Sequence, residues 1–68
     1  MKYTSISRNM RGFNFQSDFD SVEAWKKQID ADRSGNRETE WSLLLCDDGE
    51  AVWRYRRGMG CEPVSLPS

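Results

Sequence analysis

Residues 40–57, EWSLLLCDDGEAVWRYRR, contain two runs of aromatic and aliphatic residues on either side of a short acidic loop that ends in glycine. This pattern predicts a β-hairpin, because strands favour bulky residues and turns favour Asp and Gly. A three-residue loop, 47–49, with its glycine at positive φ pairs Cys46 with Glu50. The alternative is a two-residue turn at 48–49. It would set Asp47 against Glu50, two like charges, and is therefore disfavoured.

Strict alternation from the three-residue loop divides the hairpin into two faces. We expect the more aromatic face to form the core, with Trp41, Leu43, Leu45, Ala51, Trp53 and Tyr55. The other face would carry Ser42, Leu44, Cys46, Val52, Arg54 and Arg56.

Residues 3–8 and 13–16 also alternate between apolar and polar side chains, around the turn sequence NMRG at 9–12. They predict a first hairpin in which Phe13 and Phe15 point inward. A single strand followed by an irregular aromatic loop is the alternative interpretation.

A helix is predicted from Ser21 to residue 32 or 33. Asp20 and Glu23 have the spacing of a capping box, and Gly35 has the position of a helix stop. Val22, Trp25 and Ile29 are spaced to form one apolar stripe.

The sequence thus predicts one α+β domain, residues 1–57, with a ββαββ order: two hairpins in a small antiparallel sheet and one helix packed on one face. Residues 58–68 hold two glycines and two prolines and predict an irregular C-terminal tail. This tail either packs along the sheet or becomes ordered on a partner. A single helix leaves the opposite face of the sheet uncovered, and that face is the main indication of function.

Composition excludes several classes of function. The 68 residues carry a net charge of −1, unlike a polybasic nucleic-acid clamp. The chain has no histidine and only two cysteines, so it lacks the commonest general base and the residues of a zinc site. We expect no enzymatic activity, no cofactor and no metal. No apolar run approaches the ~20 residues that span a bilayer, so we expect a cytoplasmic protein with reduced thiols and no membrane partner.

Two groups of residues are candidates for binding. Arg54, Arg56 and Arg57 could contact phosphates, which would make the protein a small nucleic-acid-binding regulator; alternatively, Arg56 pairs with Glu40 across the strands. Leu44 and Val52, flanked by Ser42 and the arginines, resemble the apolar centre of a protein-binding patch. Coverage by the C-terminal tail and pairing with a second copy are the other interpretations of this patch.

In size and build, the chain resembles the compact accessory proteins of bacteriophages, among them the anti-CRISPR inhibitors. The resemblance lies in the short chain, the absence of histidine and the small α+β body, and no motif carries it. It implies a stoichiometric inhibitor that docks on a host protein or nucleoprotein complex in the bacterial cytoplasm, as a monomer or weak homodimer. The arginine cluster and the acidic turn of Asp47, Asp48 and Glu50 would then be candidate contacts.

Overall fold

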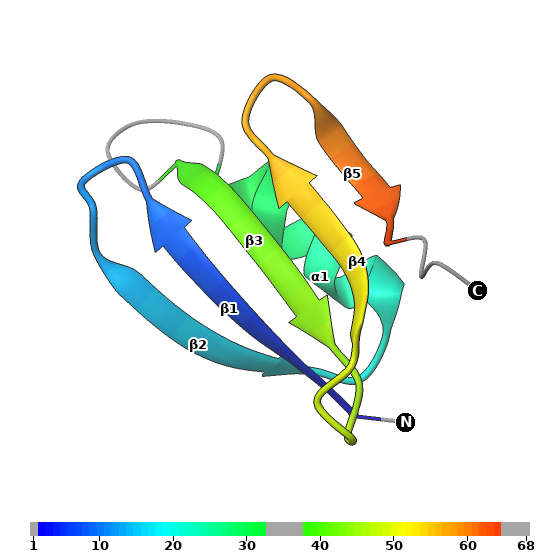
Figure 1. Ribbon diagram of the computed structural model, residues 1–68. Helices are drawn as coiled ribbons and strands as arrows, with labels where there is room; N and C mark the ends of the chain where they lie inside the picture. Colours follow the sequence, from blue (N-terminus) through cyan, green and yellow to red (C-terminus); the bar gives the residue numbers. More distant parts are fainter. Residues whose placement is uncertain (1, 33–37, 65–68) are drawn as a thin grey trace.

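The computed structural model describes residues 2–32 and 38–64. It contains β1 (Tyr3–Asn9), β2 (Asn14–Phe19), α1 (Val22–Ala31), β3 (Thr39–Leu45), β4 (Ala51–Arg56) and β5 (Gly60–Pro63). The strands form one antiparallel sheet in the order β2-β1-β3-β4-β5, and α1 lies behind it in Figure 1. The α+β class with one helix is confirmed, but the predicted ββαββ order is short by one strand.

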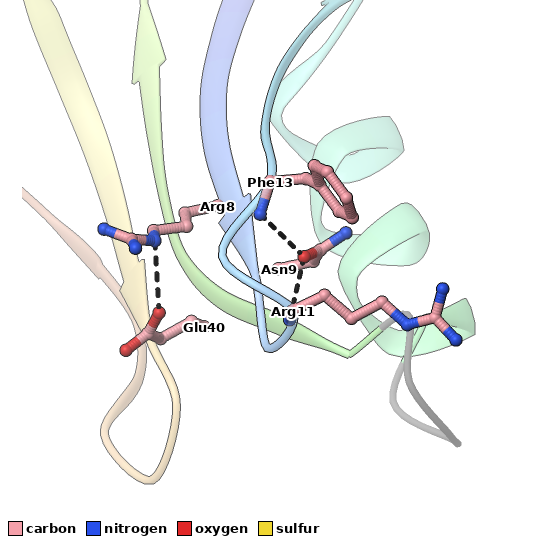
Figure 2. A network of polar contacts seen from close by, with 5 residues as sticks. All are labelled: Arg8, Asn9, Arg11, Phe13 and Glu40. Atoms are coloured by element: carbon pink, nitrogen blue, oxygen red, sulfur yellow. Dashed lines mark hydrogen bonds and ion pairs between the residues drawn. The ribbon is translucent and has the colours of Figure 1, made fainter.

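The first hairpin forms as predicted, with β1 paired to β2. Asn9 organises the turn, because its side-chain Oδ1 accepts hydrogen bonds from the backbone N–H groups of Arg11 (2.9 Å) and Phe13 (3.1 Å) (Figure 2). Gly12 has φ +85°, which only glycine adopts readily. The predicted inward position of Phe13 is wrong, since 64% of this residue is exposed at the turn.

Helix α1 and its N-cap each lie one residue later than predicted. The N-cap is Ser21, whose hydroxyl accepts the backbone N–H of Ala24 at 3.1 Å, and not Asp20. The predicted stripe is confirmed: Trp25 and Ile29 are buried and Val22 packs against them. The predicted stop at Gly35 lies outside the described residues.

The second hairpin has the predicted three-residue loop. The backbone N–H of Cys46 donates to the carbonyl of Glu50 at 2.8 Å, and Gly49 has φ +85°. Leu45 pairs with Ala51, as expected, but a β-bulge follows at once and Leu44 pairs with Trp53. Val52 is therefore an extra residue in β4.

This bulge reverses the predicted orientation of β3. Beyond it, Tyr55 pairs with Ser42 instead of Trp41. Because side chains alternate, a shift of one residue moves every side chain of one strand to the opposite face relative to the other strand. Residues 53–56 of β4 keep their predicted faces, whereas Trp41 and Leu43 of β3 turn away from the helix.

The core under α1 is small and partly polar. Its buried apolar residues are Trp25, Ile29, Leu44 and Tyr55, and Trp53 packs against them with its ring centroid 6.4 Å from that of Trp25. Three serines, Ser5, Ser7 and Ser42, are also buried beneath the helix. Their small side chains leave room for the Trp25 indole, whose N–H donates to Ser42 Oγ at 2.9 Å. Ser42 Oγ also lies 2.7 Å from Ser7 Oγ, so these buried polar groups are satisfied.

The exposed patch predicted around Leu44 and Val52 is wrong. Leu44 is 0% exposed in the core, and Val52 packs against the same cluster. Ser42, predicted to flank that patch, is 2% exposed. Phe15, also predicted inward, lies at the rim of the helix-covered side with 38% exposed.

The predicted irregular tail contributes a fifth strand. β5 pairs with β4 from Gly60 opposite Arg56 to Pro63 opposite Trp53. Pro63 is tolerated because β5 is an edge strand and ends there. The next residue, Val64, donates its N–H to the carbonyl of the bulged Val52 at 3.0 Å. Residues 65–68 lie outside the part of the chain that is described.

Candidate functional site

The face of the sheet opposite α1 is not covered by any other described helix or strand (Figure 1). Alternation and strand pairing place side chains of all five strands there. We use the name open face for eight of them, on β1, β3 and β4: Thr4, Ile6, Arg8, Trp41, Leu43, Leu45, Arg54 and Arg56. On β1 and β3, the positions that face the helix are largely serine: Ser5, Ser7 and Ser42. β1 and β3 thus present more apolar surface to the outside than to their own helix.

Strand pairing arranges the open face in rows. Trp41 lies between Arg8 of β1 and Arg56 of β4. In the next row, Leu43 lies between Ile6 and Arg54. Trp41 and Leu43 are half-buried and Ile6 is 39% exposed. The result is an apolar centre with guanidinium groups beside it, the composition typical of protein interfaces.

Two hollows adjoin Trp41. The larger, about 380 Å³, lies over β3 and β4, and its lining includes Trp41, Leu43, Arg56 and Met59. Met59 belongs to the turn before β5 and is 72% exposed. The smaller hollow, about 230 Å³, lies at the end of the strands and is also lined by Trp41 and Arg56. These two residues therefore border both depressions.

Three arginines near this face have carboxylate partners. Arg54 Nε lies 2.6 Å from Glu62 Oε1, across the β4–β5 pair. In the other two pairs, Arg57 Nε is 3.0 Å from Glu38 Oε2 and Arg8 Nε is 3.8 Å from Glu40 Oε2, the latter drawn in Figure 2.

Arg56 differs from these three arginines. Within residues 2–32 and 38–64 it has no carboxylate at ion-pair distance, and its side chain is exposed. Its predicted pairing with Glu40 is wrong, since Glu40 pairs with Arg8.

The structure brings together only part of the predicted binding set. Arg54 and Arg56 share the open face, whereas Arg57 lies in the turn after β4. The predicted acidic contacts are exposed at the opposite end of the β3–β4 hairpin: Asp47, Asp48 and Glu50. There Asp48 Oδ1 accepts the backbone N–H of Glu50 at 2.9 Å, which is a local turn contact.

Sequence reasoning missed Trp41, Leu43, Ile6 and Met59 as parts of the site. Strict alternation from the 47–49 loop places Trp41 and Leu43 on the core face, because it does not allow for the bulge at Val52. The serines of β1 could have indicated the correct face. Ser5 and Ser7 alternate with Ile6, and the large indole of Trp25 on the helix packs over small side chains.

Cys46 lies at the acidic end of the hairpin, at the end of β3. Partial burial, followed by the negative charges of Asp48, Glu50 and Asp47, raises the pKa of its thiol above the ordinary value. A raised pKa keeps the thiol protonated and lowers its reactivity.

Among the described residues, no group of three or more His, Cys, Asp and Glu side chains is arranged to hold a metal ion. In the same residues, α1 is too short and too polar to cross a bilayer. Comparisons of the chain with models of protein families, with curated proteins and with solved structures find no match.

Proposed function

We propose that this protein is a non-enzymatic binding module that docks on another protein through its open face. One observation carries the proposal: apolar side chains of the two central strands point away from the only helix among the described elements. Trp41, Leu43 and Ile6 lie outside, while Ser5, Ser7 and Ser42 lie beneath the helix. Leaving such a surface in water costs free energy that burial against a partner recovers.

The composition of the open face supports a protein partner. Trp, Met and Arg are the residues enriched at protein interfaces, and Trp and Arg dominate their binding energy. Here Trp41, Met59 and Arg56 line one hollow of about 380 Å³. A hollow between an aromatic ring and a flexible methionine can accept one large side chain of a partner.

The inhibitory part of the proposal comes from the resemblance to compact phage proteins of the anti-CRISPR type. A small rigid body with one docking face would act by occupying a site on a host protein or nucleoprotein complex in the cytoplasm. Such an inhibitor acts stoichiometrically, so the activity of an identified partner should reach its minimum at one equivalent of this protein.

The test is capture from a bacterial lysate by immobilised wild-type protein, with partners identified by mass spectrometry. Trp41→Ala removes the largest side chain of the open face. Lys27→Gln is the matched control, since Lys27 is exposed on the helix layer. Circular dichroism and thermal unfolding establish that both variants fold. The proposal expects proteins that the wild type and Lys27→Gln retain and Trp41→Ala loses; equal retention by Trp41→Ala contradicts it.

Charge reversal at Arg54 is a poor probe of this face. Arg54→Glu would place a second carboxylate beside Glu62, which now pairs with Arg54 at 2.6 Å, and would weaken the β4–β5 edge. Arg56→Glu creates no such conflict among the described residues and is the better reversal. It should abolish capture while the far-UV spectrum stays unchanged.

A nucleic-acid-binding regulator is the second candidate function. Trp41 on the open face favours it, because a half-buried aromatic ring flanked by Arg8 and Arg56 can stack on a base. The proposed arginine cluster is weaker than expected, however, because Arg54 and Arg57 are already paired with glutamates. Single-stranded oligonucleotides titrated at low and high salt test this candidate. Binding that weakens steeply with salt supports it, and no binding at low salt removes it.

A further inference from the structure

The charges around the larger hollow specify what kind of protein segment it fits. Of the four arginines on β1, β4 and the turn after β4, three have a glutamate within 4 Å: Arg8, Arg54 and Arg57. Arg56 is the exception among the described residues. These four arginines therefore carry one positive charge that no described glutamate compensates, that of Arg56. Arg56 lies beside Trp41 at the edge of both hollows.

We propose, building on the docking function above, that the open face binds an acidic segment of the partner protein. One Asp or Glu carboxylate of that segment pairs with the guanidinium of Arg56. A neighbouring large apolar side chain fills the hollow against Trp41, Leu43 and Met59. Guanidinium and carboxylate groups form paired, charge-assisted hydrogen bonds, which fix the direction of the segment as well as its affinity.

The geometry favours one carboxylate over a run of phosphates. A nucleic acid presents a negative charge at every nucleotide and needs several uncompensated cations along its path. Here Arg56 offers one, because Arg8, Arg54 and Arg57 are each paired with a glutamate. A peptide with a single acid next to an apolar residue matches this one guanidinium and the apolar hollow beside it.

The experiment is selection of a displayed library of random peptides on three immobilised proteins: the wild type, Arg56→Gln and Lys27→Gln. Arg56→Gln removes the charge of an exposed side chain, and Lys27→Gln removes the same charge from the helix layer. Enriched peptides are synthesised, and their binding is followed by the indole N–H resonance of Trp41 in ¹⁵N-labelled protein. Each peptide is paired with a version in which its acid is replaced by the corresponding amide.

The wild type and Lys27→Gln should enrich peptides in which Asp or Glu adjoins an aromatic or large aliphatic residue. Affinity should fall about tenfold or more when Arg56 is changed to Gln, and by a similar factor when the peptide acid becomes an amide. The Trp41 indole resonance should shift with the acidic peptide.

Distinct outcomes overturn the inference and the docking function. Peptides that shift Trp41 but bind Arg56→Gln as tightly as the wild type leave the docking function in place and remove the acidic segment. Stronger binding of oligothymidylate than of any peptide assigns the face to nucleic acid, and a dimer in sedimentation that Arg56→Gln dissociates assigns it to a second copy. If no selected peptide shifts the Trp41 resonance, the inference is overturned. If, in addition, Trp41→Ala captures the same lysate proteins as the wild type, the docking function is overturned too.

Discussion

The indole N–H of Trp25 donates a hydrogen bond to the hydroxyl of Ser42, 2.9 Å away and buried beneath the helix. This contact joins α1 to β3 and identifies the side of β3 that the helix covers. Ser42 and Leu44 consequently lie inside, and Trp41 and Leu43 lie on the open face. The docking proposal depends on this orientation.

Ser42→Ala should destabilise the fold by about 1–3 kcal/mol, because it leaves the buried Trp25 N–H without its acceptor and also removes the partner of Ser7. Urea unfolding measures the change. Ser5→Ala is the control: Ser5 is equally buried, but its hydroxyl makes only a 3.4 Å contact to the carbonyl of Ser17. It should cost less than about 1 kcal/mol. Equal losses for the two variants would contradict the role given to Ser42.

The helix cap gives a second comparison. Ser21→Ala removes the side chain that accepts the Ala24 N–H and should cost about 1 kcal/mol, within a range of about 0.5–2. Asp20→Ala removes a charge near the helix start and should cost only a few tenths of a kcal/mol. Thermal unfolding of both variants decides between the observed cap and the capping box that the sequence predicts. A larger loss of stability for Asp20→Ala than for Ser21→Ala would favour Asp20 as the N-cap, as the sequence predicts.

Cys46 should alkylate slowly in the folded protein. Partial burial and three nearby carboxylates raise the pKa of its thiol, so the thiolate that reacts with iodoacetamide forms only at higher pH. Peptide-resolved mass spectrometry should show the pH midpoint of alkylation above that of the same cysteine in urea.

Asp48→Asn should move that midpoint back toward the value in urea, since it removes one of the charges and keeps the oxygen that accepts the Glu50 N–H. Glu40→Gln, at the other end of β3, is the control and should leave the midpoint unchanged. A midpoint that Asp48→Asn does not lower would mean that the acidic turn has no effect on the thiol.

Local patterns in the sequence predict those parts of the fold that local interactions determine. The 47–49 loop, the turn before Gly12 and the stripe of Trp25 and Ile29 each depend on residues close in the chain, and each is confirmed. β5 was missed because an edge strand tolerates the glycines and the proline that argue against a central one.

The orientation of β3 could not be predicted in the same way. It depends on one extra residue, Val52, whose carbonyl accepts the N–H of Val64 at the end of the next strand, β5. Strict alternation from the turn cannot reveal a bulge, and hydrophobicity then favours the wrong face of β3. The unpaired charge of Arg56 was also beyond prediction, because it depends on which glutamates the neighbouring arginines contact.

The most direct test of the open face compares two adjacent leucines of β3. Leu43→Ala and Leu44→Ala make the same chemical change in the same strand, so the difference in β propensity between Leu and Ala affects both variants equally. Urea unfolding gives the free energy of unfolding of each variant. Leu44 is fully buried, and its truncation should cost about 2–5 kcal/mol. Leu43 is half-buried on the open face and should cost about 1 kcal/mol or less. A greater loss for Leu43→Ala than for Leu44→Ala would place Trp41 and Leu43 under the helix and contradict the docking face.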